Sequence, residues 1–202
     1  MGLKRYALCK GGCIMIRTSV IVCLIILFSF ANQAIAKEMA GVQLPEELNY
    51  KDVNLVLNGA GIRSKLFFDI YVSALYLGDR SQDAEKILRD DMPMGLRLHI
   101  VSGLIDKDDL KDAVKEGFEN ATGGNTQPIQ SQIDQFLTLM DSEIQDGDAF
   151  NFIYHPDSGL NIFKNGQLID AIKGLNFKRA FFGIWIGGSP VDDDLKDEML
   201  GL

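Results

Sequence analysis

Three residues of this sequence have types and spacing suited to a binding site: Arg63, Tyr71 and Tyr76. They lie in the apolar stretch Gly59–Leu77, which is rich in β-branched and aromatic side chains. A guanidinium is costly to bury unless it meets an anion, and it binds carboxylates through paired hydrogen bonds. A nearby phenol can donate a further hydrogen bond to the same group. These residues could therefore hold a carboxylate or a phenolate at the mouth of an apolar pocket.

A structural interpretation of Arg63 fits the residues equally well, with Arg63 paired to an internal carboxylate such as Asp69 and both tyrosines packed in the core. If Gly59–Leu77 is one strand, alternation places Tyr71 on the face of Arg63, and Tyr76 reaches that face only through a kink or bulge. The opposite face is predicted to be core, and it comprises Leu66, Phe68, Ile70, Val72, Ala74 and Tyr76.

Other catalytic or metal-binding patterns are scarce. His99 and His155 do not have the spacing of metal ligands, and we expect structural or solvated roles for both. No nucleophile-elbow, zinc-protease or phosphate-loop motif occurs. The acidic run 192–194 is expected to favour a helix N-terminus rather than to bind calcium. The sequence therefore predicts no metal site and no cofactor.

The first thirty-six residues are predicted to form a secretory signal peptide. Arg17 precedes an eleven-residue apolar run, Val20–Phe30, and Ala34-Ile35-Ala36 matches an A-x-A cleavage pattern. The run is shorter than the roughly 20 residues that span a bilayer, and the A-x-A pattern disfavours an uncleaved anchor. Met15 is an alternative start, which would make residues 1–14 a mis-assigned extension. Cleavage would leave a periplasmic or secreted chain of residues 37–202.

Residues 37–202 have the length of a single domain with room for a proper core. The three cysteines all precede this part, so it has no thiol chemistry and no cysteine-ligated metal. Four of the 20 basic residues and none of the 28 acidic ones lie before residue 37, which leaves 16 against 28 and a net charge of −12. Such a charge disfavours nucleic acid and anionic membranes as partners. We expect no membrane insertion after cleavage, and the oligomeric state stays open.

The elements that must position Arg63 follow an α+β order. Strands are predicted at 41–48, 53–57 and 96–101, and in a hairpin meander over 150–172 whose turn is Asn165-Gly166. Helices are predicted at 81–91, 106–120 and 129–144, with a buried apolar helix at 175–186. Phe181, Phe182 and Trp185 are expected to be core. Ser189-Pro190 is predicted to open a short acidic final helix.

Two motifs resemble the bacterial chalcone isomerase-like family: Gly61-Ile62-Arg63-Ser64-Lys65, and F-x-x-Y-x-x-A-L-Y-L at Phe68–Leu77. Further similar parts are Glu116-Gly117-Phe118, the Asn165-Gly166 hairpin, and Phe182–Gly187 before Ser189-Pro190. The resemblance covers nearly all of residues 37–202. It implies an α+β fold, the chalcone isomerase-like open-faced β-sandwich. In that fold a large antiparallel sheet has helices layered on one face and a ligand cleft between them.

The same resemblance implies a function for Arg63. In plant chalcone isomerase an arginine on this strand orients the substrate, and a threonine and a tyrosine polarise its ketone. Arg63 matches that arginine, but Tyr71 stands where the threonine is expected. Relatives in the superfamily bind fatty acids through an arginine and a tyrosine on the carboxylate, an arrangement that Arg63 with Tyr76, or with Tyr71, resembles.

The function expected from these likenesses is non-enzymatic binding of a lipophilic carboxylate such as a fatty acid, with Arg63, Tyr71 and Tyr76 as ligand-binding residues. One alternative is an isomerase, or intramolecular lyase, that acts on a phenolic or carbonyl substrate in the same cleft. Arg63 would then stabilise developing oxyanion charge, and no other catalytic residue is assigned. Another alternative is an interaction module with a fully packed core.

Overall fold

The computed structural model describes residues 1–2, 37–103, 107–141 and 143–202. The chain divides into two compact units, Met1–Ile35 and Ala36–Leu202. Every described residue of the buried core lies in the second unit. The predicted signal peptide falls outside the described residues, apart from residues 1–2. Across the described ranges, no helix combines the length and apolarity needed to cross a membrane.

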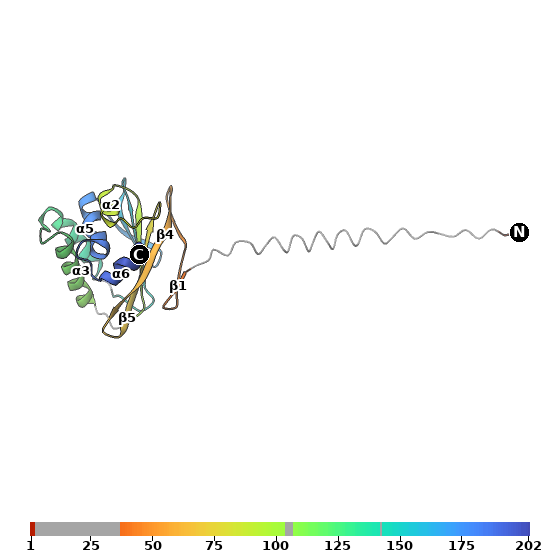
Figure 1. The fold of residues 1–202 in the computed structure, drawn as a ribbon, viewed down its shortest axis with the longest axis horizontal. Helices are drawn as coiled ribbons and strands as arrows, with labels where there is room; N and C mark the ends of the chain where they lie inside the picture. The colour runs from red at the N-terminus through yellow and green to blue at the C-terminus, as the bar shows by residue number, and fades with distance from the viewer. Residues whose placement is uncertain (3–36, 104–106, 142) are drawn as a thin grey trace. The chain divides into compact units, whose positions relative to one another are not determined.

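A seven-stranded antiparallel sheet forms the centre of the second unit, and Figure 1 labels its strands β4 and β5. The spatial order of the strands follows the chain order from β3 to β9. The strands are β3 (Glu47–Tyr50), β4 (Val53–Lys65), β5 (Phe68–Leu77), β6 (Met94–Ile100), β7 (Ala149–His155), β8 (Gly159–Lys164) and β9 (Gln167–Ile172). A separate hairpin joins β1 (Lys37–Met39) to β2 (Val42–Leu44). The predicted α+β class with one large antiparallel sheet is confirmed.

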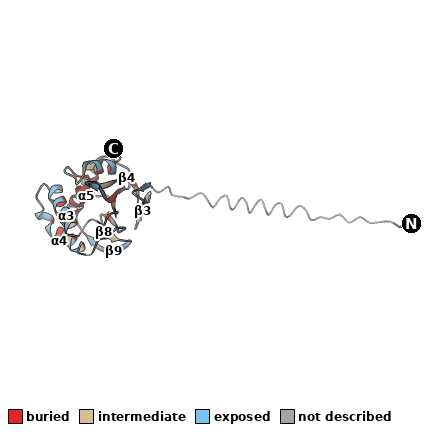
Figure 2. Cartoon of the chain, turned by 90° about the horizontal axis from the view of Figure 1, so that it is seen from below, coloured by how far each residue is buried: buried red, intermediate tan, exposed pale blue. Residues whose placement is uncertain are grey.

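The two faces of the sheet are covered differently. The helices are α2 (Ala84–Arg89), α3 (Lys107–Ala121), α4 (Gln130–Leu139, after the 3-10 turn Gln127–Ile129), α5 (Leu175–Ile186) and α6 (Asp193–Leu200). Helices α3 to α6 pack an aromatic-rich core against one face, where Phe152 of β7 meets Phe181 of α5 at 4.9 Å between ring centroids. On the other face, Val42 and Leu44 of β2 pack in a smaller core with Val72. Figure 2 shows the buried residues of the chain in red.

The stretch Gly59–Leu77 is a hairpin rather than one strand. Strand β4 runs through Asn58 and Gly59 to Lys65, and β5 returns from Phe68. The predicted strand at 53–57 begins correctly, but the prediction that it ends before Gly59 was wrong. The predicted core positions Leu66 and Phe68 are 85% and 56% exposed, because Leu66 lies in the hairpin turn and Phe68 is the first residue of β5.

Helix α6 packs so closely against strand β4 that position 59 requires glycine. The side-chain amide of Asn58 donates to the main-chain oxygen of Met199 at 2.9 Å, which fixes the helix against the strand. A Cβ placed on Gly59 would lie 2.6 Å from that same Met199 oxygen. The glycine is thus required by the close approach of two backbones.

Helix boundaries differ from the predictions in ways that capping explains. Helix α2 begins after Asp83, whose side chain accepts from the Lys86 amide at 2.9 Å, and not at residue 81 as predicted. Helix α6 begins after Asp192 rather than at Ser189-Pro190, because the Asp192 side chain accepts from the Leu195 amide. The helix predicted to reach residue 144 ends at Leu139.

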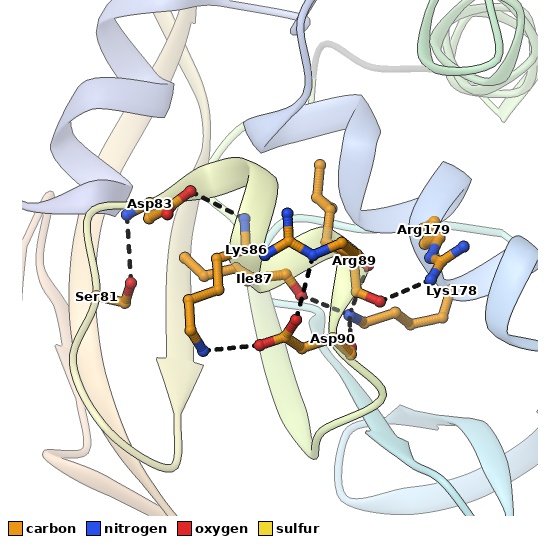
Figure 3. Close-up of polar contacts among 9 residues, drawn as sticks. Ser81, Asp83, Lys86, Ile87, Arg89, Asp90, Lys178 and Arg179 are labelled. Atoms are coloured by element: carbon orange, nitrogen blue, oxygen red, sulfur yellow. Dashed lines mark hydrogen bonds and ion pairs between the residues drawn. The ribbon is translucent and has the colours of Figure 1, made fainter.

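Lys178 is fully buried within α5 and ties that helix to the end of α2. Its Nζ donates to the main-chain oxygens of Ile87 at 2.6 Å, Leu88 at 3.1 Å and Asp90 at 3.0 Å (Figure 3). A positive charge is favoured at a helix C-terminus. Burial, helped by the neighbouring charge of Arg179, nevertheless lowers the pKa of Lys178 to about 8. The prediction of a buried helix at 175–186 is confirmed, with this one cation inside it.

Candidate functional site

Arg63 and Tyr71 are brought together by the β4–β5 hairpin. They are direct cross-strand partners in its register, just before a bulge between Arg63 and Ser64. Directly opposite residues of an antiparallel pair have neighbouring side chains on one face of the sheet. Tyr71 is 7% exposed, whereas the side chain of Arg63 is 28% exposed. The phenol is therefore buried beside a guanidinium that still reaches the surface.

The hydroxyl of Tyr71 is held by Trp185 of α5, whose indole Nε1 donates to it at 3.1 Å. An indole N–H can only donate, so the Tyr71 oxygen is the acceptor and its own proton stays available. Among the described residues, none accepts that proton. Burial raises the pKa of Tyr71 to about 12, although Trp185 and the charge of Arg63 oppose that rise. Tyr71 is thus a neutral hydrogen-bond donor at physiological pH.

Arg63 has an internal partner, which is Asp192 rather than the predicted Asp69. Its Nη1 lies 2.5 Å from a carboxylate oxygen of Asp192 and also donates to the main-chain oxygen of Ser64 at 3.0 Å. Asp69 instead accepts from the Ser64 hydroxyl at 2.8 Å. A guanidinium has five N–H donors. Because both bonds to described residues use Nη1, the N–H groups on Nε and Nη2 remain for a ligand.

Tyr76 lies away from this pair. It belongs to the smaller core on the opposite face of the sheet, and its hydroxyl donates to the main-chain oxygen of Pro45 at 2.9 Å. Burial raises the pKa of Tyr76 above its ordinary value. The sheet therefore brings Tyr71 to Arg63 and leaves Tyr76 on the other side, as strand alternation indicates.

A cavity of about 470 Å³ opens beside Arg63 and Tyr71, between the sheet and the helices. Its apolar wall from the sheet consists of Ile70, Leu98, Ile100, Phe150, Phe152, Ile162 and Ile169. Its apolar wall from the helical side includes Val114, Phe136, Leu139, Met140, Ile144, Ile184 and Val191. Its polar groups are Arg63, Lys65, Tyr71, Glu116, Asn120 and Trp185. The volume and the few polar groups are typical of a site for a small apolar molecule with one polar end.

Several residues of this site were not identified from the sequence. Trp185 is core, as predicted, but it also orients the Tyr71 hydroxyl. Asp192 caps a helix, as expected of the acidic run, and it also holds Arg63. Glu116 and Asn120 of α3 lie one helical turn apart and share a face, a spacing that could have indicated a common surface.

The two histidines lie outside the cavity lining. His155 accepts from the Asp157 amide at 3.2 Å, and His99 is partly buried in β6. Over the described part of the chain, no group of three or more potential ligands is placed to hold a metal ion.

Comparison with known proteins identifies the class to which this fold and cavity belong. A model of the chalcone isomerase-like family matches residues 36–201, so the chain is a member of that family. A solved structure of a fatty-acid binding protein from Arabidopsis thaliana superposes with a TM-score of 0.66 at 17% identity. The superposition covers 83% of this chain and 96% of that one. No curated protein sequence matches this chain.

Proposed function

We propose that this protein binds a lipophilic carboxylate, such as a fatty acid, without transforming it. The acyl chain would occupy the apolar cavity between the sheet and the helices. The carboxylate would accept from the free N–H groups of Arg63 and from the Tyr71 hydroxyl. Membership of the chalcone isomerase-like family, with a structural relative that is a fatty-acid binding protein, supports this assignment.

One observation carries the proposal: two unused hydrogen-bond donors of different kinds adjoin one apolar cavity. Arg63 uses only Nη1 on its described protein partners, and Tyr71 accepts from Trp185 while its own proton stays free. A carboxylate supplies the acceptors that both donors lack. Tyr76 is not part of this arrangement, since its hydroxyl is bonded to Pro45 on the other face.

We further propose that the protein is exported and acts in the periplasm or outside the cell. The family match begins at residue 36 and the compact unit begins at Ala36, which agrees with cleavage after Ala36. N-terminal sequencing of the protein from expressing cells tests this, and Lys37 is the expected first residue. A protein that keeps residues 20–36 contradicts it.

Native mass spectrometry of the protein purified from cells tests the binding function. The wild type should carry a bound lipid mass, and the Arg63→Ala variant should lose most of it. Arg89→Ala is the matched control because Arg89 is an exposed arginine outside the cavity lining, and it should keep the lipid. Absence of lipid from the wild type, or equal retention by Arg63→Ala, contradicts the proposal.

The isomerase alternative uses the same cleft and is decided by a different measurement. Purified protein is incubated with chalcone-like phenols, and ring closure is followed against the spontaneous background. We expect no excess turnover, because burial raises the pKa of Tyr71 to about 12 and a neutral phenol is a poor general base. Turnover above background that Arg63→Ala abolishes would replace the binding proposal.

A further inference from the structure

The tip of the β4–β5 hairpin presents three consecutive large apolar side chains to solvent. Leu66 is 85% exposed, Phe67 is 97% exposed and Phe68 is 56% exposed. Leu66 also has a φ of 61°, a left-handed conformation in which asparagine or glycine is the usual choice. An ordinary surface turn favours neither these residue types nor this conformation. Clustered exposed apolar residues of this kind mark interaction sites.

The tip adjoins residues that line the cavity. Lys65, which lines the cavity, is the cross-strand partner of Phe68. Ile70 and Tyr71, a few residues further along β5, also line it. The hairpin that holds the proposed carboxylate anchor therefore ends in the apolar tip. In Figure 1 it is the pair of orange strands labelled β4 and β5.

A second exposed apolar pair lies at the same end of the sheet. Tyr71 of β5 pairs with Ile100 at the end of β6. The pairings of the following strands place the start of β7, the end of β8 and the start of β9 at this same end of the sheet. There Leu168 is 57% exposed and Ile169 is 42% exposed, and Ile169 lines the cavity. Exposed apolar residues thus lie next to the cavity lining both on the β4–β5 hairpin and on the edge strand β9.

We infer that the Leu66-Phe67-Phe68 tip inserts into the interface of a lipid bilayer and places the cavity entrance at the membrane surface. This inference rests on the proposed function, because a lipophilic carboxylate resides in bilayers and must leave or enter one to reach the cavity. A projecting tip of three side chains suits a deformable lipid phase better than a flat protein surface. This inference departs from the expectation of no membrane insertion, because the tip inserts its side chains into the interface, although the chain does not span the membrane.

The net charge of the protein indicates the lipid charge of the bilayer that the tip would enter. Residues 37–202 carry a net charge of −12, which opposes approach to an anionic surface. Attraction by Lys65 is therefore a minor contribution, and apolar insertion is the main one. The partner is accordingly a bilayer of neutral, zwitterionic lipid.

Co-sedimentation with sucrose-loaded phosphatidylcholine vesicles tests the inference on residues 37–202, which hold the described buried core and lack the apolar leader. The tip variant combines Leu66→Asn, Phe67→Ser and Phe68→Thr, choices that suit a left-handed turn and a strand end. The control is Met92→Ser, which removes an apolar side chain that is 63% exposed and lies two residues before Met94, the partner of Leu77 at the opposite end of β5 from the tip. Thermal melts confirm that both variants fold.

The wild type and Met92→Ser should bind vesicles equally, and the tip variant should bind at least tenfold more weakly. Adding 30% phosphatidylglycerol should not strengthen wild-type binding. Equal vesicle binding by the tip variant, binding that requires the anionic lipid, or a tip-dependent dimer in size-exclusion chromatography would each overturn the inference.

Binding of free fatty acid in solution separates this inference from the proposed function. Leu66, Phe67 and Phe68 do not line the cavity, so the tip variant should bind fatty acid within twofold of the wild type. Fatty-acid binding without vesicle binding overturns only the membrane inference. Vesicle binding without fatty-acid binding overturns only the proposed function.

Discussion

At the scale of single residues, the site depends on which hydrogen-bond donors the protein leaves unused. Trp185 can only donate, so it makes the Tyr71 oxygen an acceptor and leaves the phenol proton for a ligand. Asp192 and Ser64 both bind Nη1 of Arg63, which leaves the other edge of the guanidinium open. The internal ion pair and the ligand anchor, which the sequence offered as alternatives, are compatible in one arginine.

Tyr71→Phe should weaken fatty-acid binding by about tenfold, because it removes one hydrogen bond worth about 1–1.5 kcal/mol. Tyr76→Phe is the matched control. It removes a buried tyrosine hydroxyl that is bonded to Pro45 instead of facing the cavity. Titration calorimetry should give wild-type affinity for Tyr76→Phe, and equal affinity losses in the two variants would remove Tyr71 from the site.

Lys178 gives the stability of the protein a dependence on pH. Its pKa is about 8 in the folded chain and close to 10.4 in an unfolded one, so the unfolded chain binds more protons between these values. The free energy of unfolding should therefore rise with pH from about 8 to about 10.5, by roughly 1–3 kcal/mol for this group.

Urea unfolding of wild type and Lys178→Met at pH 7 and pH 10 isolates that contribution. The stability of the wild type relative to the variant should be greater at pH 10 than at pH 7. A smaller relative stability at pH 10 than at pH 7 would contradict this. It would mean that the carbonyls of Ile87, Leu88 and Asp90 stabilise the charged Lys178 ammonium by more than burial destabilises it.

At the scale of elements, the β4–β5 hairpin and helix α6 together build the proposed carboxylate anchor. The hairpin register places Arg63 opposite Tyr71, and the first residue before α6 supplies Asp192. Asp192 has two roles, since one oxygen caps the helix by accepting from Leu195 and the other binds Arg63. Changes in α6 should therefore reach the ligand through Arg63.

Asp192→Asn separates the two roles. Asparagine is as good an N-cap as aspartate, so α6 should persist and stability should change by less than about 1 kcal/mol. The uncompensated Arg63 should then bind a ligand carboxylate about three- to tenfold more tightly, as measured by displacement of a fluorescent fatty acid. A weaker affinity would show that Asp192 is needed to orient Arg63. An unchanged affinity would show that Arg63 does not contact the ligand carboxylate.

At the scale of the whole molecule, the fold class was predictable from the sequence because strand alternation, helical periodicity and the Asn165-Gly166 turn all have local causes. Asn165 and Gly166 have φ values of 50° and 81°, as such a turn requires. The hairpin at Leu66-Phe67 was missed because its turn lacks glycine, proline and asparagine. Without those signals, an apolar run of this length resembles one continuous strand.

The site was predictable only in part, for a related reason. Arg63 and Tyr71 are close in sequence, so local reasoning placed them on one face. Their partners Asp192 and Trp185 are more than a hundred residues away and meet them only through the packing of α5 and α6. Long-range contacts of this kind leave no periodic pattern in a single sequence.

The most direct test of carboxylate recognition at Arg63 is the affinity of the protein for a long-chain fatty acid compared with that for its methyl ester. The two ligands share the acyl chain that is proposed to fill the cavity, and they differ in the group that is proposed to meet Arg63 and Tyr71. The wild type should bind the acid at least tenfold more tightly, and Arg63→Gln should abolish the difference, since a charge-assisted hydrogen bond contributes about 1.5–3 kcal/mol. Equal affinity of the wild type for acid and ester would contradict carboxylate recognition by Arg63.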